Sequence, residues 1–327
     1  MNKIYYISVL FLIIFTGCSS KQYYEPEDTY SFPQDTLDLK SSIIDLNSNG
    51  ATLEDNIFVS SKGVLPNQKD GYKFLNFSDN TILSANLNAS IYLQNTQMNE
   101  LLSFDKNIIS ASKKKDLLAF SSIDNSITLY NIKTKQVLFK EYLKSSLLNN
   151  IKIANPIFLN TVVLYPTLDG KVVIVDLRSN TIVKTINIDP NNDVNNIIFL
   201  KEIDETLIAA TSKKLFTFLN GKVNLKEIDV QNIIVNKNNI YVATLDGEIQ
   251  KYNFSLQKTA SQKFKFAKFN ALAFGSALYA LESQDFLIKI SEDFKKIKVF
   301  DFSFDEEEKV IGIDNKIYFD DEYLILK

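Results

Sequence analysis

The sequence predicts an all-β protein and, within that class, a single β-propeller. Three observations support this prediction: short segments rich in Val, Ile, Tyr and Phe from about residue 52 onward, polar turns between them, and one hairpin that occurs twice. The hairpin reads TLDGKVVIVDL from Thr167 and TLDGEIQKYNF from Thr244. A unit that recurs along a chain is typical of a repeat architecture, in which each copy packs on its neighbours.

The repeat is clearest in the strand that precedes each hairpin. Its copies begin about 40 residues apart, as expected for propeller blades, at Ile82, Leu117, Val162, Leu207, Ile240, Leu278 and Ile317. Each strand leads to a turn such as Asp124-Asn125, Asp169-Gly170 or Asp246-Gly247, which suits the positive φ angles of a two-residue hairpin. Two further strands and an apolar segment follow, so we expect about four strands per blade.

The number of copies favours about seven blades. The last unit ends only two strands in, at IYFDDEYLILK, and residues 51–65 offer two strands from the other end. We therefore expect strands from both termini to close the last blade, which would leave no open edge in the ring. If residues 51–65 begin a blade of their own, the number of blades is eight. A β-sandwich is the alternative fold, but it does not explain why the turn types repeat.

The N-terminus has the features of a secretory signal. An apolar run from Ile4 to Phe15 is too short to span a hydrocarbon core of about 30 Å, and small residues follow it before Cys18. This order resembles a bacterial lipobox. It implies a signal peptide at 1–17 and an acylated Cys18 that carries chains such as palmitate. The alternative is an ordinary secretory signal with an unused thiol.

Residues 18–40 are acidic and contain two Pro without sustained periodicity, so we expect a flexible tether there and the propeller domain at 41–327. The resemblance to lipoproteins also gives Ser19 a meaning, because an Asp after the lipidated Cys retains many lipoproteins at the inner membrane. Ser19 therefore indicates an outer-membrane protein that faces the periplasm.

The composition excludes several kinds of chemistry. The chain contains no His and no Trp, and Cys18 is its single Cys, so a Ser-His-Asp triad, an imidazole metal site and an internal disulfide are impossible. The formal net charge of −3 and the lack of a basic stripe argue against nucleic-acid binding. We expect no enzymatic activity, no cofactor and no metal. Acidic runs at 305–308 and 320–322 are expected to lie in solvated turns.

The segment 155–188 resembles the repeat of PQQ-type propellers, through Asn155-Pro156, Asp169-Gly170, Asp176 and Thr181. It departs from that pattern where Trp and Gly are usual. Together with the lipobox and the acidic tether, the chain resembles the BamB family of lipoproteins from the outer-membrane β-barrel assembly machinery. The missing Trp puts the cofactor-dependent enzymes that share this repeat in doubt.

The resemblance implies a lipid-anchored scaffold that is monomeric within a complex and binds the periplasmic domains of barrel-assembly proteins. The alternative is a cell-envelope lipoprotein that binds a ligand or acts as a sensor, with the ligand over the central channel. The sequence alone does not choose between these functions, since many propellers share the motifs.

Overall fold

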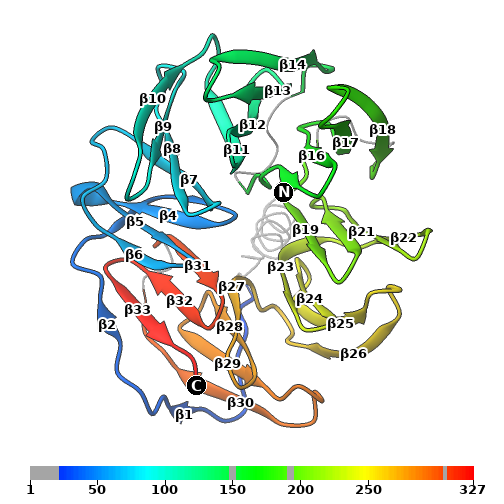
Figure 1. The fold of residues 1–327 in the computed structure, drawn as a ribbon. Coiled ribbons are helices and arrows are strands. Elements are labelled where there is room, and N and C mark those ends of the chain that lie inside the picture. Colours follow the sequence, from blue (N-terminus) through cyan, green and yellow to red (C-terminus); the bar gives the residue numbers. More distant parts are fainter. Residues whose placement is uncertain (1–21, 147–151, 190–194, 305–307) are drawn as a thin grey trace, which may run out of the picture.

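Eight β-sheets stand around a common axis like the blades of a propeller (Figure 1). The computed structural model describes residues 22–146, 152–189, 195–304 and 308–327. We number the blades 1 to 8 in chain order. The all-β propeller is confirmed, and the preferred number of seven blades is wrong, because the chain forms the alternative of eight.

The strands of each blade run from the axis outward in chain order. Blades 1 to 4 contain β3 (Ile43–Asn47), β4 (Gly50–Leu53), β5 (Ile57–Ser60) and β6 (Gly63–Leu65); β7 (Lys73–Ser78), β8 (Thr81–Ala85), β9 (Ser90–Gln94) and β10 (Asn99–Ser103); β11 (Ile108–Lys114), β12 (Leu117–Ser122), β13 (Ser126–Asn131) and β14 (Gln136–Tyr142); and β15 (Ile157–Phe158), β16 (Val162–Pro166), β17 (Lys171–Asp176) and β18 (Thr181–Asn187).

The second half of the ring repeats the same arrangement. Blades 5 to 8 contain β19 (Phe199–Ile203), β20 (Thr206–Ala210), β21 (Lys214–Leu219) and β22 (Lys222–Glu227); β23 (Val230–Asn236), β24 (Asn239–Thr244), β25 (Glu248–Asn253) and β26 (Lys258–Lys263); β27 (Phe269–Phe274), β28 (Leu278–Glu282), β29 (Phe286–Ile290) and β30 (Ile297–Asp301); and β31 (Val310–Ile313), β32 (Lys316–Phe319) and β33 (Glu322–Ile325). A 3-10 turn, Glu54–Asn56, separates β4 from β5.

Blade 1 is the one that the repeat did not reveal. The seven strands found from the sequence are the second strands of blades 2 to 8, and the second strand of blade 1 is β4, which begins at Gly50. A Cβ on Gly50 would lie 2.1 Å from the Val59 carbonyl oxygen and 2.4 Å from the Phe74 ring. Close packing therefore requires Gly at the start of this strand, and this hides the repeat.

Strands from both termini do close the ring, but the N-terminal one lies further upstream than expected. β2 (Leu37–Asp38) pairs with β33 as the fourth strand of blade 8, and β1 (Tyr30–Ser31) pairs with β30 as a fifth strand of blade 7. Both strands lie in the segment expected to be a tether, and they run along the outside of blades 7 and 8 (Figure 1). The described part of that segment thus packs on the propeller, and its flexibility stays a prediction.

The hydrophobic core lies between adjacent blades. One buried cluster joins Ala119, Ile127 and Leu129 of blade 3 to Val163 and Tyr165 of blade 4, and similar clusters join other neighbouring pairs. Each of these blades therefore buries its faces against its neighbours, which is why its strands are apolar without clean alternation.

The Asp-Gly hairpins have longer loops than expected. The Gly247 N–H donates to the Thr244 carbonyl at 3.1 Å, and the Asn125 N–H donates to the Ser122 carbonyl at 2.9 Å. Gly247, Asn125 and Gly170 have φ angles of 82°, 62° and 75°, whereas the Asp before each of them does not have a positive φ. A turn followed by one left-handed residue is a three-residue loop. The positive φ is confirmed at Gly170 and Gly247, and the two-residue loop is wrong.

Candidate functional site

The lipidation site predicted from the sequence, Cys18, lies outside the described residues, as does the signal peptide. Within the ranges that the structure describes, no group of three or more acidic or Cys side chains is arranged to hold a metal ion. The same part of the chain contains no helix that is long and apolar enough to cross a bilayer. The search for a site therefore turns to the axis and the outer rim of the propeller.

The innermost strands surround a central cavity of about 730 Å³. Asn side chains line it, but they are used in the fold. Three of them donate from Nδ2 to a backbone carbonyl of the following blade: Asn47 to Phe74 at 2.5 Å, Asn76 to Ala111 at 3.0 Å and Asn232 to Phe269 at 2.6 Å. Buried polar groups need such partners. The Asn side chains thus join one blade to the next at the axis.

Residues 152–155, the last part of the connection between blades 3 and 4, lie against this cavity. Ser48 of blade 1 donates to the Ile153 carbonyl at 2.6 Å. Asn155 accepts from the Ala111 N–H at 2.9 Å and donates to the Leu75 carbonyl at 3.2 Å. The segment 152–155 therefore contacts blades 1, 2 and 3 on one side of the axis.

On the other side of the axis, the same segment contacts blade 6 and the loop that leads into blade 5. Lys152 Nζ donates to Asn232 Oδ1 at 2.5 Å and to the Gln231 carbonyl at 3.2 Å, and the Lys152 carbonyl accepts from Asn196 at 3.0 Å. Burial lowers the pKa of Lys152 to about 8. A half-buried cation thus ties the crossing segment to blade 6, and the segment joins blades on both sides of the axis.

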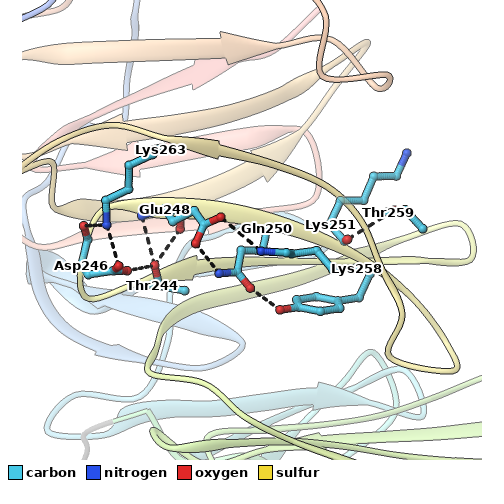
Figure 2. A network of polar contacts seen from close by, with 9 residues as sticks. Thr244, Asp246, Glu248, Gln250, Lys251, Lys258, Thr259 and Lys263 are labelled. Atoms are coloured by element: carbon cyan, nitrogen blue, oxygen red, sulfur yellow. Dashed lines mark hydrogen bonds and ion pairs between the residues drawn. The ribbon is translucent and has the colours of Figure 1, made fainter.

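The polar network drawn in Figure 2 lies on blade 6, toward the rim. Thr244 Oγ1 accepts from the Glu248 N–H at 3.0 Å, and Lys263 Nζ donates to Asp246 Oδ2 at 2.5 Å. The Lys263 hydrogen bond lowers the pKa of Asp246. Desolvation raises the pKa of Glu248, but hydrogen bonds and nearby charges outweigh it, and the net direction is downward. Both carboxylates are therefore ionised and paired, which is the behaviour of structural acids rather than of a general acid or base.

The rim of blades 2 to 5 has a different character. Their outermost strands expose large apolar side chains: Leu101 on β10, Val137 and Tyr142 on β14, Ile182 and Val183 on β18, and Val223 and Leu225 on β22. β6 of blade 1 exposes one such side chain, Val64, and β26 of blade 6 and β30 of blade 7 expose none. β10, β14, β18 and β22 are the outer edges of their sheets, with no strand beyond them in the described chain. Apolar side chains on unpaired edges mark surfaces that bind other proteins.

Between blades 4 and 5 this rim opens into a groove of about 560 Å³. Apolar side chains of both blades line it, among them Leu164, Ile174 and Ile186 of blade 4 and Leu207 and Phe218 of blade 5. Charged side chains also line it: Lys184 Nζ lies 5.7 Å from the Phe218 ring centre, and Glu202 and Glu205 lie on the side of blade 5. The groove is thus an apolar slot bordered by one basic and two acidic side chains.

The motif residues of the repeat prove to be structural. Asp176 accepts from the backbone N–H groups of Ser179 at 2.7 Å and Arg178 at 3.0 Å, and so stabilises the turn before β18. Asn155 joins blades at the axis, as described above. The exposed rim and the groove were missed by sequence reasoning, because β18 reads TIVKTIN and looks like any other strand. Only its place at the edge of a blade reveals that Ile182 and Val183 are exposed.

Comparisons with known proteins were made for sequence and for structure. No protein-family model matches the chain. A plasminogen-binding protein, PgbB, of Helicobacter pylori strain J99 is 32% identical over 257 residues, which cover 74% of this chain and 46% of that protein. PgbB of strain 26695 is 28% identical over 384 residues, which cover 99% of this chain and 71% of that protein. The chain thus spans about half the length of the J99 relative that it matches.

Solved structures share the fold at low sequence identity. BamB from Moraxella catarrhalis aligns with a TM-score of 0.64 at 14% identity, and the alignment covers 90% of this chain and 98% of the BamB chain. The C-terminal WD40 domain of Sif2 has a TM-score of 0.65 at 13% identity and covers 91% and 100%. These likenesses support a BamB-like and WD40-like propeller fold. The sequence relatives are PgbB proteins rather than BamB, so the expected family is supported in its fold alone.

Proposed function

We propose that the protein is a non-enzymatic propeller that binds other proteins through the outer rim of blades 2 to 5. The exposed apolar side chains on the free edges β10, β14, β18 and β22 carry this proposal. Two kinds of comparison agree with it, since the sequence relatives are named for binding a protein and BamB is a propeller of similar fold. Such a rim offers both apolar contact area and unpaired backbone groups to a partner.

The cellular setting in this proposal is the periplasmic face of the outer membrane. Cys18 carries the lipid anchor after removal of residues 1–17, and the propeller holds the periplasmic domains of barrel-assembly proteins as a monomer within their complex. The lipobox-like order of residues before Cys18 and the BamB-like fold support this role.

The experiment compares the wild-type protein with a quadruple variant, Leu101→Ser, Tyr142→Ser, Val183→Ser and Val223→Ser. All four side chains are exposed, so the variant should fold normally. Cross-linking in intact cells should join the wild type to the central barrel-assembly protein, and the variant should lose that product. Equal cross-linking of both proteins would exclude the rim, and the absence of any barrel-assembly protein would exclude that partner.

The sequence relatives suggest a second candidate partner. PgbB is named for binding plasminogen, and it aligns with 99% of this chain at 28% identity. Purified plasminogen should then bind the immobilised propeller and bind the quadruple rim variant less well. The remaining alternative is a ligand-binding or sensory lipoprotein that uses the central cavity. In that case, substitution of Lys152 would abolish binding and the rim variant would keep it.

A further inference from the structure

Blade 7 shows how an extended segment covers the outer edge of a blade. β1 pairs in parallel with β30, with Tyr30 opposite Phe300. The next aromatic residue, Phe32, packs its ring against Phe300 at 5.2 Å and Phe302 at 6.0 Å between ring centres. The segment therefore adds a strand to the blade and places an aromatic side chain against the apolar cluster between blades 7 and 8.

The position of Phe300 can be found in other blades from the turn that precedes the third strand. In blade 7 that turn ends at Asp285, with a φ of 64°, and Leu287 two residues later pairs with Phe300. In blade 4 it ends at Gly170, with a φ of 75°, and Val172 two residues later pairs with Ile186. Ile186 in β18 thus corresponds to Phe300 in β30.

The same rule gives polar residues on two other blades. Asn125 leads to Ile127, which pairs with Glu141 in blade 3, and Gly247 leads to Ile249, which pairs with Gln262 in blade 6. In blade 2 the turn ends at Ala89, and Ile91 two residues later pairs with Leu102. The Leu102 side chain is already buried, at 6% exposure. Of these blades, blade 4 is the one that combines an apolar residue at this position with an unfilled groove and a free edge.

We infer that the groove between blades 4 and 5 binds an extended segment of a partner protein, which pairs with the free edge of β18 as a fifth strand of blade 4. Its apolar side chains, at every second position, occupy the slot over Ile186, as Phe32 does over Phe300 in blade 7. This inference rests on the proposed protein-binding function and assigns it one site and one mode of recognition.

The charges that line the groove define the partner further. Glu202 and Glu205 form no ion pair within the described chain, and the Glu202 carboxylate accepts the Glu205 N–H at 2.8 Å. Lys184 lies over the Phe218 ring, as Lys298 of β30 lies over the Tyr30 ring of β1 at 5.7 Å. The segment therefore carries a basic residue at one of the alternate positions that face blade 5, and aromatic or β-branched residues at the other positions on that face.

The test uses a capped, fluorescent peptide, Thr-Phe-Thr-Phe-Thr-Lys-Thr-Val, whose two Phe, Lys and Val lie on one face of the extended strand, and the full propeller domain. Fluorescence polarisation should show saturable binding. Hydrogen exchange should slow at the amides of β18 and stay unchanged in β26.

Ile186→Glu should weaken binding about tenfold or more, because it places a charge in an apolar slot. The double variant Glu202→Lys, Glu205→Lys changes exposed residues only and should also weaken it. Gln262→Glu at the matched position of blade 6 is the control and should bind as the wild type does.

A peptide with N-methyl groups at alternate positions separates strand pairing from simple apolar contact, because it cannot donate hydrogen bonds to the strand. It should fail to bind. No binding by the parent peptide, equal binding by the methylated one, or equal loss in Ile186→Glu and Gln262→Glu would each overturn the inference. A dimer of the wild type that Ile186→Glu dissolves would make a second copy of this chain the occupant instead. A protein partner that cross-links equally to wild type and Ile186→Glu would overturn this site and leave the proposed function intact.

Discussion

Gly247 and Gly71 have similar backbone conformations but very different surroundings. Their φ angles are 82° and 73°, both in the region that favours Gly. A Cβ on Gly247 would lie 2.4 Å from the Phe264 carbonyl oxygen and 2.9 Å from that of Ala267, whereas a Cβ on Gly71 would meet nothing within 4 Å. Gly247 is thus required for space as well as for its backbone angle, whereas the equivalent turn position in blade 3 holds Asn125.

Gly247→Ala should therefore lower the free energy of unfolding by more than Gly71→Ala does. We expect about 1 kcal/mol for Gly71→Ala from the positive φ alone, and at least about 1 kcal/mol more for Gly247→Ala from the backbone clash. Urea denaturation of both variants measures the difference. Equal losses would mean that the turn relaxes around the new methyl group.

Lys152 should make the stability of the propeller depend on pH. Its pKa is about 8 in the folded chain, below its ordinary value of 10.5, so above pH 8 the unfolded chain binds more protons than the folded one. The free energy of unfolding therefore rises from about pH 8 to pH 10, by up to roughly 3 kcal/mol. Above pH 10 the buried Tyr residues oppose this trend, because burial raises the pKa of Tyr318 to about 12.

Thermal unfolding of wild type and Lys152→Met between pH 7 and pH 10 tests this dependence. Met keeps an unbranched side chain without the charge, so its melting temperature should rise less over the same range. Parallel curves for the two proteins would assign the pH dependence to other groups.

At the scale of elements, the segment that carries β1 and β2 holds the outside of blades 7 and 8. Tyr24 begins the contact, with its ring 5.8 Å from each of the Phe264 and Phe286 rings, and Phe32 continues it between blades 7 and 8. Short strands of two residues form few hydrogen bonds, so the aromatic contacts supply much of the stability of this attachment.

Phe32→Ala should release β1 from β30 while leaving the ring closed by β2. We expect a loss of about 2–3 kcal/mol in stability of that segment, since a partly buried aromatic side chain is removed. Hydrogen exchange should accelerate at Tyr30, Ser31 and the facing edge of β30. Tyr23→Ala is the matched control, because Tyr23 is 46% exposed, and it should leave the exchange rates of β1 unchanged.

The sequence predicted the blades whose second strand has Ile, Leu or Val at its first or second position, together with the turn residues that have a positive φ. Both features depend on which residues stand next to one another in the chain. It offered blade 1 only as an alternative, because the repeat is hidden where Gly50 packs against Phe74 from the next blade. The interval from Leu117 to Val162, which contains the segment that crosses the axis, is as long as the next one, from Val162 to Leu207, so its length gives no signal of the crossing.

The groove could not be predicted, because Ile186 and Phe218 line one slot only when two blades are placed side by side. For the same reason the pairing of Leu37 with Tyr323 depends on ring closure and not on local pattern. Contacts between distant segments decide the site, and no periodicity within one segment records them.

For the whole molecule, the open and the covered parts of the rim lie on opposite sides of the ring. β1 and β2 cover blades 7 and 8, and β14 and β18 stand across the axis on blades 3 and 4 (Figure 1). An anchor upstream of Tyr24 would therefore leave the free edges directed away from the point of attachment, where a partner can reach them.

The anchor itself is tested at Cys18. We expect labelled palmitate to be incorporated into the wild-type protein and not into Cys18→Ser, and the variant should move from the membrane fraction to the soluble fraction of the cell envelope. Two acyl chains suffice for stable anchoring, since each buried methylene contributes about 0.8 kcal/mol. Equal labelling of the two proteins would refute the lipid anchor, and a secreted wild type would support the ordinary signal peptide.

The path of the N-terminal segment also determines how the protein would respond to mechanical force. A pull on the chain upstream of Tyr24 first loads the Tyr24 ring contacts, then the pairing of β1 with β30, and then Phe32. The β2–β33 pairing that closes the ring comes last along this path. The outer contacts can therefore break and re-form under load while the β2–β33 pairing keeps the ring closed. A tethered molecule that is pulled by its partner would then extend at its N-terminal segment without unfolding the propeller.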